Sequence, residues 1–149
     1  MGKEQKLLPE YFRDAGYTTR LIGKWHLGFY QQQYAPTNRG FDSFFGYLGP
    51  YIDYFDYTMK DFQYDYTRGY DMRRNLTVAK DFDPIYATNL FTKEAVNVIS
   101  KHDKKSPLYL QLNHIAPHTG NQDFPMQAPD DVIAKFSNIP SLKRRTLAG

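Results

Sequence analysis

The sequence predicts an α/β fold, in which helices flank a mixed and mainly parallel β-sheet. Apolar residues recur at helical spacing over residues 3–15 and 86–101, and strand-like runs follow at 17–24 and 108–112. A strand, a helix and a second strand in this order are typical of a βαβ unit with parallel strands. Polar and cationic residues follow both predicted strands, and ligands of such sheets bind beyond the carboxyl ends of the strands.

The first predicted helix occupies residues 3–15. Its apolar positions are Leu7, Leu8, Tyr11, Phe12 and Ala15. Because a helix tolerates proline in its first turn, Pro9 indicates that the regular helix begins near it. Gly16 is expected to end the helix. The strand predicted over 17–24 is rich in β-branched and aromatic residues.

An aromatic-rich stretch over residues 40–70 keeps neither the helical nor the strand period, and we expect a long ordered loop with short strands. Two interpretations of its rings are open: they pack the loop down, or they line a site for a sugar or aryl group. The aromatic residues are Phe41, Phe44, Phe45, Tyr47, Tyr51, Tyr54, Phe55, Tyr57, Phe62, Tyr64, Tyr66 and Tyr70. The acidic residues between them are Asp53, Asp56, Asp61 and Asp65.

The second predicted helix occupies residues 86–101, with Thr88 as its expected N-cap. Its apolar stripe consists of Leu90, Phe91, Ala95, Val98 and Ile99. The strand predicted over 108–112 alternates leucine with Tyr109 and Gln111, and we expect it to be buried.

The composition restricts the class of protein. With 149 residues, of which 41% are hydrophobic and 23% charged, the chain is long enough for one domain with a core. No run approaches the about 18 apolar residues of a membrane span, so we expect no membrane-spanning segment. The net charge is only +3, and the basic cluster Lys143-Arg144-Arg145 is too small to indicate a nucleic-acid partner. Without cysteine, the chain forms no disulfide and no thiolate metal site.

The candidate site begins where the first strand ends, in the segment GKWHLG over residues 23–28. In an extended backbone Lys24 and His26 would point to the same side, where they could hold an anion or a reacting oxygen. His118 follows the later parallel strand and is expected at the same edge of the sheet. For the Lys-x-His pattern alone, a strand end with two solvated polar groups is the competing interpretation.

Two ordered blocks carry a resemblance to a known family. Residues 15–47 read AGYTTRLIGKWHLGFYQQQYAPTNRGFDSFFGY, and YATNLFTK over 86–93 is followed by SPLYLQL and APH within 106–118. These blocks resemble the type I sulfatase family and its arylsulfatase B-like branch. The resemblance implies part of an alkaline-phosphatase/sulfatase-like sandwich and the hydrolysis of sulfate esters. It also implies calcium and formylglycine as cofactors, a sulfated small molecule or glycan as partner, and a lysosomal or extracellular location.

The same resemblance implies roles for three residues. Lys24 would bridge the formylglycine and a sulfate oxygen, and His26 would hydrogen-bond the formylglycine and help to deprotonate it. His118 would bind sulfate and protonate the departing alkoxide. An imidazole suits such work because its unperturbed pKa lies near 6.5.

Four nearby residues are open to other interpretations. His114 is the rival of His118, and it is expected either to be structural or to support the site by a hydrogen bond; a metal pair of the two histidines is disfavoured by the intervening proline. We expect Trp25 to pack rather than to act in catalysis. Arg39 is expected to bind Asp42 or the backbone, although a substrate contact is open. His102 is expected to complement a helix dipole.

This sequence departs from the family pattern in its nucleophile and its metal ligands. The family signature is Cys or Ser followed by x-Pro-x-Arg, and its first residue becomes formylglycine. The chain has no cysteine, and none of its serines begins this motif. The calcium-binding Asp-Asp pair that lies near the N-terminus of the family pattern is absent, and so is the later Asp-Asn-Gly segment that completes the metal site. We therefore expect residues 1–149 to be an interior part of a sulfatase catalytic domain, without a metal site and inactive by itself.

Three hypotheses from different classes remain. The chain is part of a working sulfatase, or a catalytically inactive sulfatase-like protein or truncated gene product that binds anionic glycans, or an unrelated aromatic-rich carbohydrate-binding module. The last leaves both ordered blocks unexplained. The N-terminus has no apolar signal-peptide region. The sequon Asn75-Leu76-Thr77 predicts N-glycosylation of Asn75 if the chain enters the secretory pathway.

Overall fold

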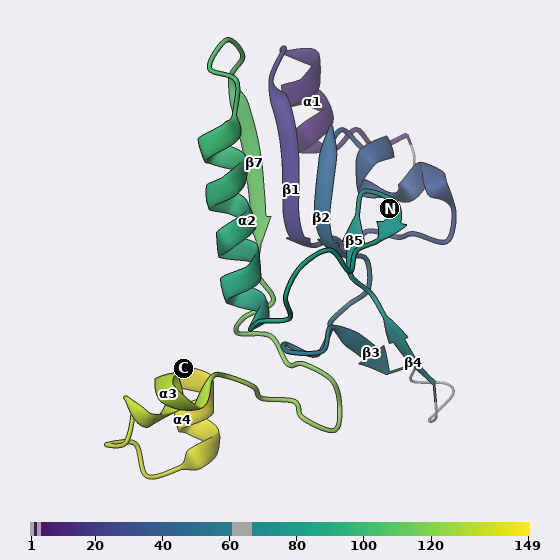
Figure 1. The fold of residues 1–149 in the computed structure, drawn as a ribbon. Helices are drawn as coiled ribbons and strands as arrows, with labels where there is room; N and C mark the ends of the chain where they lie inside the picture. Colours follow the sequence, from purple (N-terminus) through teal and green to yellow (C-terminus); the bar gives the residue numbers. More distant parts are fainter. Residues whose placement is uncertain (1, 3, 61–66) are drawn as a thin grey trace.

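The computed structural model describes residue 2, residues 4–60 and residues 67–149, and its architecture is the expected α/β fold (Figure 1). The main sheet has the strand order β6-β5-β2-β1-β7, and a separate two-stranded sheet pairs β3 with β4. The elements are α1 Leu8–Asp14, β1 Thr18–Lys24, η1 Gln32–Tyr34, η2 Pro36–Asn38, β2 Ser43–Tyr47, β3 Thr58–Lys60, β4 Arg68–Tyr70, β5 Arg73–Arg74, β6 Thr77–Val78, α2 Ala87–Lys101, β7 Leu108–Asn113, α3 Asp130–Ala134 and α4 Leu142–Ala148.

The first helix is shorter than expected, but both of its predicted boundary signals hold. It begins one residue before Pro9, in the turn that tolerates proline. At its end Gly16 takes φ +85°, and its N–H donates to the Arg13 carbonyl. The next N–H, of Tyr17, donates to the Phe12 carbonyl, and the two rings meet edge to face at 5.0 Å. This is a Schellman C-cap with its hydrophobic contact, and it turns the chain directly into β1.

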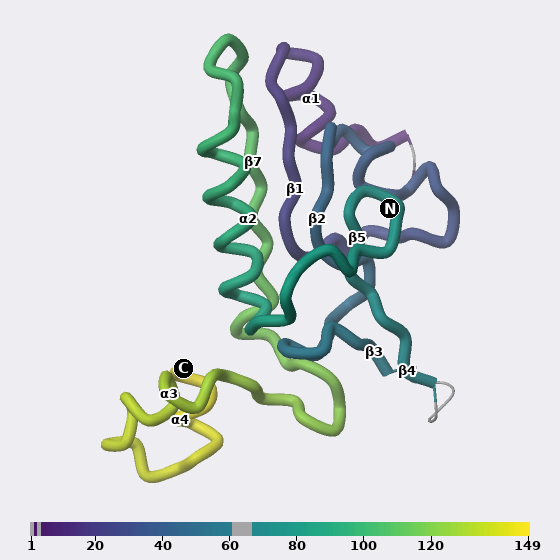
Figure 2. Tube along the Cα trace, viewed as in Figure 1, coloured from purple at the N-terminus to yellow at the C-terminus, as the bar shows by residue number. Residues whose placement is uncertain are grey.

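β1 is a central strand of the main sheet, because it pairs in parallel with β2 on one side and β7 on the other. The predicted parallel pairing of β1 with β7 is thus confirmed, and α2 runs alongside β7 in Figures 1 and 2. The connection is longer than a simple βαβ unit, because β2 to β6 precede α2 in the chain. The two faces of β1 enter different clusters. Ile22 belongs to the larger apolar cluster under α2, whereas Leu21 packs with Trp25 and Phe41.

The aromatic-rich stretch contains one strand of the main sheet that the sequence did not single out. β2 lies within this stretch and beside β1 at the centre of the sheet. Because both faces of β2 are buried, polar and apolar residues do not alternate along it, and the sequence therefore did not mark it as a strand. Most of the rings are core residues, namely Phe41, Phe44, Phe45, Tyr47, Tyr51, Tyr54 and Tyr57. Packing is therefore the correct interpretation for these rings. Asp61, Phe62, Tyr64, Asp65 and Tyr66 lie outside the described residues.

The predicted apolar stripe of the second helix is largely confirmed, but Ile99 and the N-cap differ from the prediction. Leu90, Phe91 and Ala95 are buried in the larger cluster, but Ile99 is 58% exposed. The stripe drifts away from the sheet at this end, because 3.6 residues per turn do not keep it on one line. Thr88 is not the N-cap: the helix begins at Ala87 with Tyr86 before it, and no side chain caps its first turn.

β7 was predicted to be buried, and this is wrong. Among the described residues it is the edge strand, since it pairs only with β1, and its residues are partly exposed. Leu112 is 38% exposed. The alternation of leucine with polar residues indicated a strand but could not indicate whether another strand lies beyond it. After β7 the chain runs to α3 and α4, which lie beyond the carboxyl ends of β1 and β7 (Figure 1).

Candidate active site

The chain leaves β1 at Lys24 but follows β2 for two further residues. The N–H of Trp25 donates to the Tyr47 carbonyl at 3.0 Å, and that of His26 to the Leu48 carbonyl at 3.2 Å. His26 itself takes φ +55°, a left-handed conformation that residues other than glycine rarely adopt. The extended backbone assumed for Lys24 and His26 is therefore wrong at His26. Such strain in a residue fixed on both sides is typical of functional sites.

Lys24, His26 and His118 nevertheless lie close enough to influence one another. Partial burial lowers the pKa of His26, and the positive charges of Lys24 and His118 lower it further. Burial also lowers the pKa of Lys24. Within the described part of the chain, neither Lys24 nor His26 forms an ion pair with an acidic side chain. A cluster of cationic groups without a paired acid favours binding of an anion.

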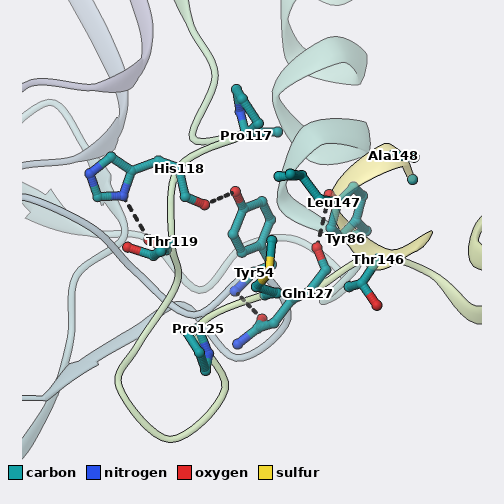
Figure 3. Close-up of a pocket in the computed structure, with 13 residues that line it drawn as sticks. Tyr54, Tyr86, Pro117, His118, Thr119, Pro125, Gln127, Thr146, Leu147 and Ala148 are labelled. Carbon is teal, nitrogen blue, oxygen red and sulfur yellow. Dashed lines mark hydrogen bonds between the residues drawn. The ribbon is translucent and has the colours of Figure 1, made fainter. Parts of the chain in front are cut away.

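His118 reaches this cluster from β7, and hydrogen bonds fix its segment. The Asn113 amide at the end of β7 donates to the Lys24 carbonyl at 2.9 Å, which ties the two strand ends together. Beyond the cis Ala116–Pro117 bond, the His118 N–H donates to the Ile115 carbonyl at 2.7 Å. The Tyr54 hydroxyl donates to the His118 carbonyl at 2.6 Å (Figure 3).

The imidazole of His118 has a defined tautomer. Its Nδ1 lies 2.7 Å from the Thr119 carbonyl oxygen, and a carbonyl oxygen can only accept a hydrogen bond (Figure 3). Nδ1 therefore carries a proton, which leaves Nε2 as the atom that accepts or delivers a proton.

Cavities lie on both sides of the His118 segment. One of about 260 Å³ is lined by Tyr54, Tyr86 and Leu147, and the imidazole of His118 is turned away from these residues (Figure 3). Tyr54 and Tyr86 stack at 5.3 Å and are both buried, so their faces are in use within the protein. Another cavity of about 340 Å³ lies between Pro50, Tyr51 and the segment 118–122. His118 is the residue of the cluster that lines this second cavity, whereas Lys24 and His26 are not among its lining residues.

The other histidines do not join the cluster as ligands. The ring of His114 lies 6.4 Å from that of Phe91, its buried Nδ1 has no hydrogen-bond partner among the described residues, and burial lowers its pKa. Of the two roles left open for His114, these contacts favour the structural one. The segment from His114 to His118 is not helical, so the two rings do not share a helix face. His102 ends α2, and its Nε2 donates to the Ser106 carbonyl at 2.7 Å.

Trp25 and Arg39 have structural roles, as predicted. The Trp25 indole N–H donates to the carbonyls of Gly28 and Tyr34 at 2.9 and 3.0 Å, which fixes the loop after the cluster. Arg39 is 2% exposed and donates to the Gln5 carbonyl at 2.6 Å. Its acidic neighbour is Glu10 at 3.7 Å rather than the expected Asp42. Asp42 instead accepts from the N–H of Thr19 at 2.8 Å.

The described residues do not form a site for calcium, and the sequence does not contain the formylglycine motif. In the described residues, no three side chains of His, Cys, Asp or Glu gather in a way that could hold a metal ion. Calcium requires several oxygen ligands, so we derive no step through it from this chain. Formylglycine is formed from cysteine or serine in a Cys/Ser-x-Pro-x-Arg motif, and this motif does not occur in the sequence.

Sequence reasoning missed the residues that hold the His118 segment in place. Asn121 is 1% exposed and hydrogen-bonds to the buried carboxylate of Asp53, as does the side chain of Gln127. These partners are separated by about seventy residues. No local pattern could have paired them. The sequence showed only that a proline-rich segment contains Asn121 and Gln127 and that an aromatic-rich segment contains Asp53.

Comparisons with known proteins identify the family of this chain. The sulfatase family model matches residues 2–143, and the chain belongs to this family. Arylsulfatase J of Mus musculus is 37% identical over 142 residues, which are 95% of this chain and 23% of that protein. An arylsulfatase of Klebsiella aerogenes is 34% identical over 134 residues, which are 87% of this chain and 26% of that protein. The chain thus spans about a quarter of the length of these relatives.

A solved structure shows the same fold. Ps i-CgsB in complex with k-i-k-neocarrahexaose superposes with a TM-score of 0.82 at 32% sequence identity. The superposition covers 99% of this chain and 33% of the Ps i-CgsB chain. The expected class, an α/β fold of the sulfatase type with a mostly parallel sheet, is therefore confirmed. No helix in the described ranges is long and apolar enough to cross a membrane.

Proposed function

We propose that this chain forms the anion-binding side of a sulfatase active centre and holds the sulfate group of a sulfate ester. The observation that supports this is the meeting of Lys24, His26 and His118 at the carboxyl ends of two neighbouring parallel strands, where charges of Lys24 and His118 lower the pKa of His26. Three cationic or protonatable groups around one spot match the charge of a tetrahedral oxyanion.

In this proposal each group has a chemical task. Lys24 holds a sulfate oxygen by its charge, and His26 donates a hydrogen bond to the same group. As the sulfur–oxygen bond breaks, negative charge develops on the leaving oxygen. His118 in its protonated form delivers the Nε2 proton to that oxygen, which leaves as an alcohol while the imidazole becomes neutral. The nucleophile and the metal that complete the reaction in the family are not supplied by residues of this chain.

We propose a sulfated sugar as the substrate class. A relative of this chain, N-acetylgalactosamine-6-sulfatase of Mus musculus, is 34% identical over 127 residues, and the solved relative Ps i-CgsB was obtained with an oligosaccharide. Aryl sulfates are the alternative substrates, since two relatives are named arylsulfatases. The cavity of about 340 Å³ beside His118 has room for one sugar ring.

We also propose a lysosomal or extracellular location, with a glycan on Asn75. This residue is exposed in the tight turn between β5 and β6, and its Oδ1 accepts from the Phe44 N–H at 2.9 Å. Its Nδ2, the atom that would carry the glycan, has no hydrogen bond to the described residues. Expression of the chain behind a secretory signal sequence in a eukaryotic cell should give a glycosidase-sensitive species that is lost in Asn75→Gln. An unmodified wild-type chain would contradict the proposal.

The competing function is a sulfatase-like protein that binds anionic glycans without turnover. The cluster of Lys24, His26 and His118 is compatible with both functions, because an anion can be bound there with or without turnover. Hydrolysis of a sulfated sugar by the longer protein that contains this chain would exclude it.

Anion binding can be tested on the 149-residue chain. Titration with sodium sulfate, followed by NMR of the histidine rings, should shift His26 and His118 but not His102. Galactose 6-sulfate should produce the same shifts, and galactose should not. Lys24→Ala should weaken binding roughly tenfold or more because it removes the main charge, whereas Lys93→Ala, an exposed lysine on α2, should not. If sulfate shifts the NMR signals of neither His26 nor His118, the proposed function is disproved.

A further inference from the structure

Asp53 is a buried acid whose oxygens are all occupied by neutral donors. It is 7% exposed. Its Oδ1 accepts from the N–H groups of Phe55 and Asp56 at 2.9 and 3.0 Å, which closes the turn after Asp53. Its Oδ2 accepts from the side-chain amides of Asn121 and Gln127 at 2.8 and 2.7 Å. One side of the carboxylate thus shapes its own loop, and the other side holds a segment far along the chain.

Each of the two amides also accepts hydrogen bonds from backbone N–H groups. The Oδ1 of Asn121 accepts from the N–H groups of Asp123 and Phe124 at 3.1 and 3.0 Å. The Oε1 of Gln127 accepts from the Tyr54 N–H at 2.8 Å. Every polar atom in this arrangement therefore has a partner, which is the condition under which a buried polar network rigidifies its surroundings.

Tyr54 connects this network to the site. It follows Asp53 in the sequence, is 2% exposed, and its hydroxyl donates to the carbonyl of His118 at 2.6 Å. Asp53 and Tyr54 thus hold the 118–127 segment at both ends, by the His118 carbonyl at one end and by Gln127 at the other. Figure 3 shows the contacts of Tyr54 with His118 and Gln127. We call these four residues, Asp53, Tyr54, Asn121 and Gln127, the Asp53 clamp.

We propose that the Asp53 clamp positions His118, so that the Nε2 of its imidazole faces the anion held by Lys24 and His26. The inference rests on the proposed function for the identity of that anion. Asp53 is a positioning residue, since it contacts neither His26 nor His118 and acts through the backbone of the 118–127 segment. The Nδ1 bond of His118 to Thr119 depends on the conformation of that backbone and sets which ring nitrogen is free.

A second set of contacts joins the same two regions but is exposed. Arg68 on β4 pairs with Asp123, and Lys60 on β3 approaches the same carboxylate at 3.5 Å. Exposed ion pairs contribute about 0–1 kcal/mol to stability, so they support the segment weakly. The buried clamp is the contact that fixes its geometry.

The test compares Asp53→Asn with the wild-type chain. The substitution keeps the size of the side chain but removes one acceptor, so that an amide faces the donors of Asn121 and Gln127. Nitrogen-15 NMR of the rings should show a pure Nδ1–H form for His118 in the wild type and a mixture of tautomers in the variant. His102 is an internal control with the opposite tautomer, since its Nε2 donates to Ser106, and its signal should not change. Amide hydrogen exchange at Asp123 and Phe124 should accelerate at least tenfold.

Two further variants complete the experiment. Asp103→Asn alters an exposed turn acid whose carboxylate accepts from the Lys105 N–H, and it should leave His118 unchanged. The double variant Asp53→Asn with Asn121→Asp restores a carboxylate–amide pair with reversed polarity, and it should recover part of the His118 tautomer signal. A folded Asp53→Asn chain with wild-type His118 tautomer and wild-type exchange would overturn the proposal. If Asp53→Asn does not fold, Tyr54→Phe decides: it removes only the hydroxyl bond to His118, and an unchanged His118 signal would equally overturn the proposal.

These measurements separate the two proposals. The tautomer and exchange readouts are made without sulfate, so they test the clamp even if the wild-type chain binds no sulfate. Conversely, wild-type sulfate binding that is unaffected by a disrupted His118 tautomer would support the anion site and contradict a role for the clamp in it. We expect sulfate affinity to fall roughly tenfold in Asp53→Asn, because a misplaced imidazole loses most of its contact with the anion.

Discussion

The carbonyl oxygen of Asn113 occupies the space that a side chain on Gly23 would need. A Cβ atom built on Gly23 would lie 1.9 Å from this oxygen, and Gly23 takes φ +98°. Gly23 precedes Lys24, and Asn113 in turn donates to the Lys24 carbonyl. The close approach of β1 and β7 therefore sets the position from which Lys24 leaves the sheet.

Gly23→Ala should destabilise the chain by about 3 kcal/mol or more, because it adds a backbone collision to an unfavourable φ. Thermal or urea denaturation followed by circular dichroism measures this. Gly69→Ala on β4 is the matched control, since a Cβ there has no heavy atom of the described residues within 4 Å. Equal stability of the two variants would show that β1 and β7 do not approach as closely as described.

The pKa of His26 should rise when sulfate binds. Burial and the charges of Lys24 and His118 lower this pKa in the folded protein, so the folded chain binds the proton less readily than the unfolded chain. The contribution of neutral His26 to the free energy of unfolding is therefore present above about pH 6.5, and it is lost as the pH falls through the lowered pKa. An anion offsets the neighbouring charges, so sulfate should bind more tightly as the pH is lowered. An NMR pH titration of His26 with and without sulfate measures both effects, and identical titration curves would contradict the shared site.

Lys24→Ala should also raise the pKa of His26, but without sulfate. The variant removes a positive charge that lowers this pKa in the wild type. The same NMR titration is the measurement, and Lys93→Ala is the control because Lys93 lies exposed on α2. A His26 pKa that stays at the wild-type value in Lys24→Ala would mean that the two side chains are too far apart to bind one anion.

Phe91→Ala should lower the free energy of unfolding by roughly 3–5 kcal/mol. The ring is fully buried and contacts the rings of Tyr47 on β2 and His114 after β7, at 6.2 and 6.4 Å between centroids. Ile99→Ala on the same helix removes a side chain that is 58% exposed, and it should change stability by less than about 0.5 kcal/mol. Urea denaturation distinguishes the two, and a small effect of Phe91→Ala would contradict the packing of α2 on the sheet.

The 149-residue chain should not hydrolyse sulfate esters by itself, because the sequence lacks the formylglycine motif. An assay of the purified chain with 4-nitrophenyl sulfate should show no product above a blank without protein. The same chain with His118→Ala serves as the control for contaminating sulfatases, since a contaminant would be unaffected by the substitution. Activity that is present in the wild type and lost in His118→Ala would disprove this expectation.

The local sequence was a sufficient guide wherever neighbouring residues decide the structure. Pro9 and Gly16 marked the ends of the first helix because their backbone preferences act within a turn. The order of strand, helix and strand indicated parallel pairing of β1 with β7, and the positions of Lys24 and His118 after these strands indicated a common edge. The local sequence failed for β2, whose burial on both faces removed the alternation that marks a half-exposed strand.

The sequence alone thus determined the family, the α/β class and the three candidate residues, since periodicity, turn chemistry and ordered motifs are all local properties. Only the tertiary structure decided that His26 is left-handed, that β7 is an edge strand in the described part of the chain, and that Asp53 holds the His118 segment. These features depend on contacts between residues far apart in the chain. Their energies arise only when the sheet brings the loops at its carboxyl edge together.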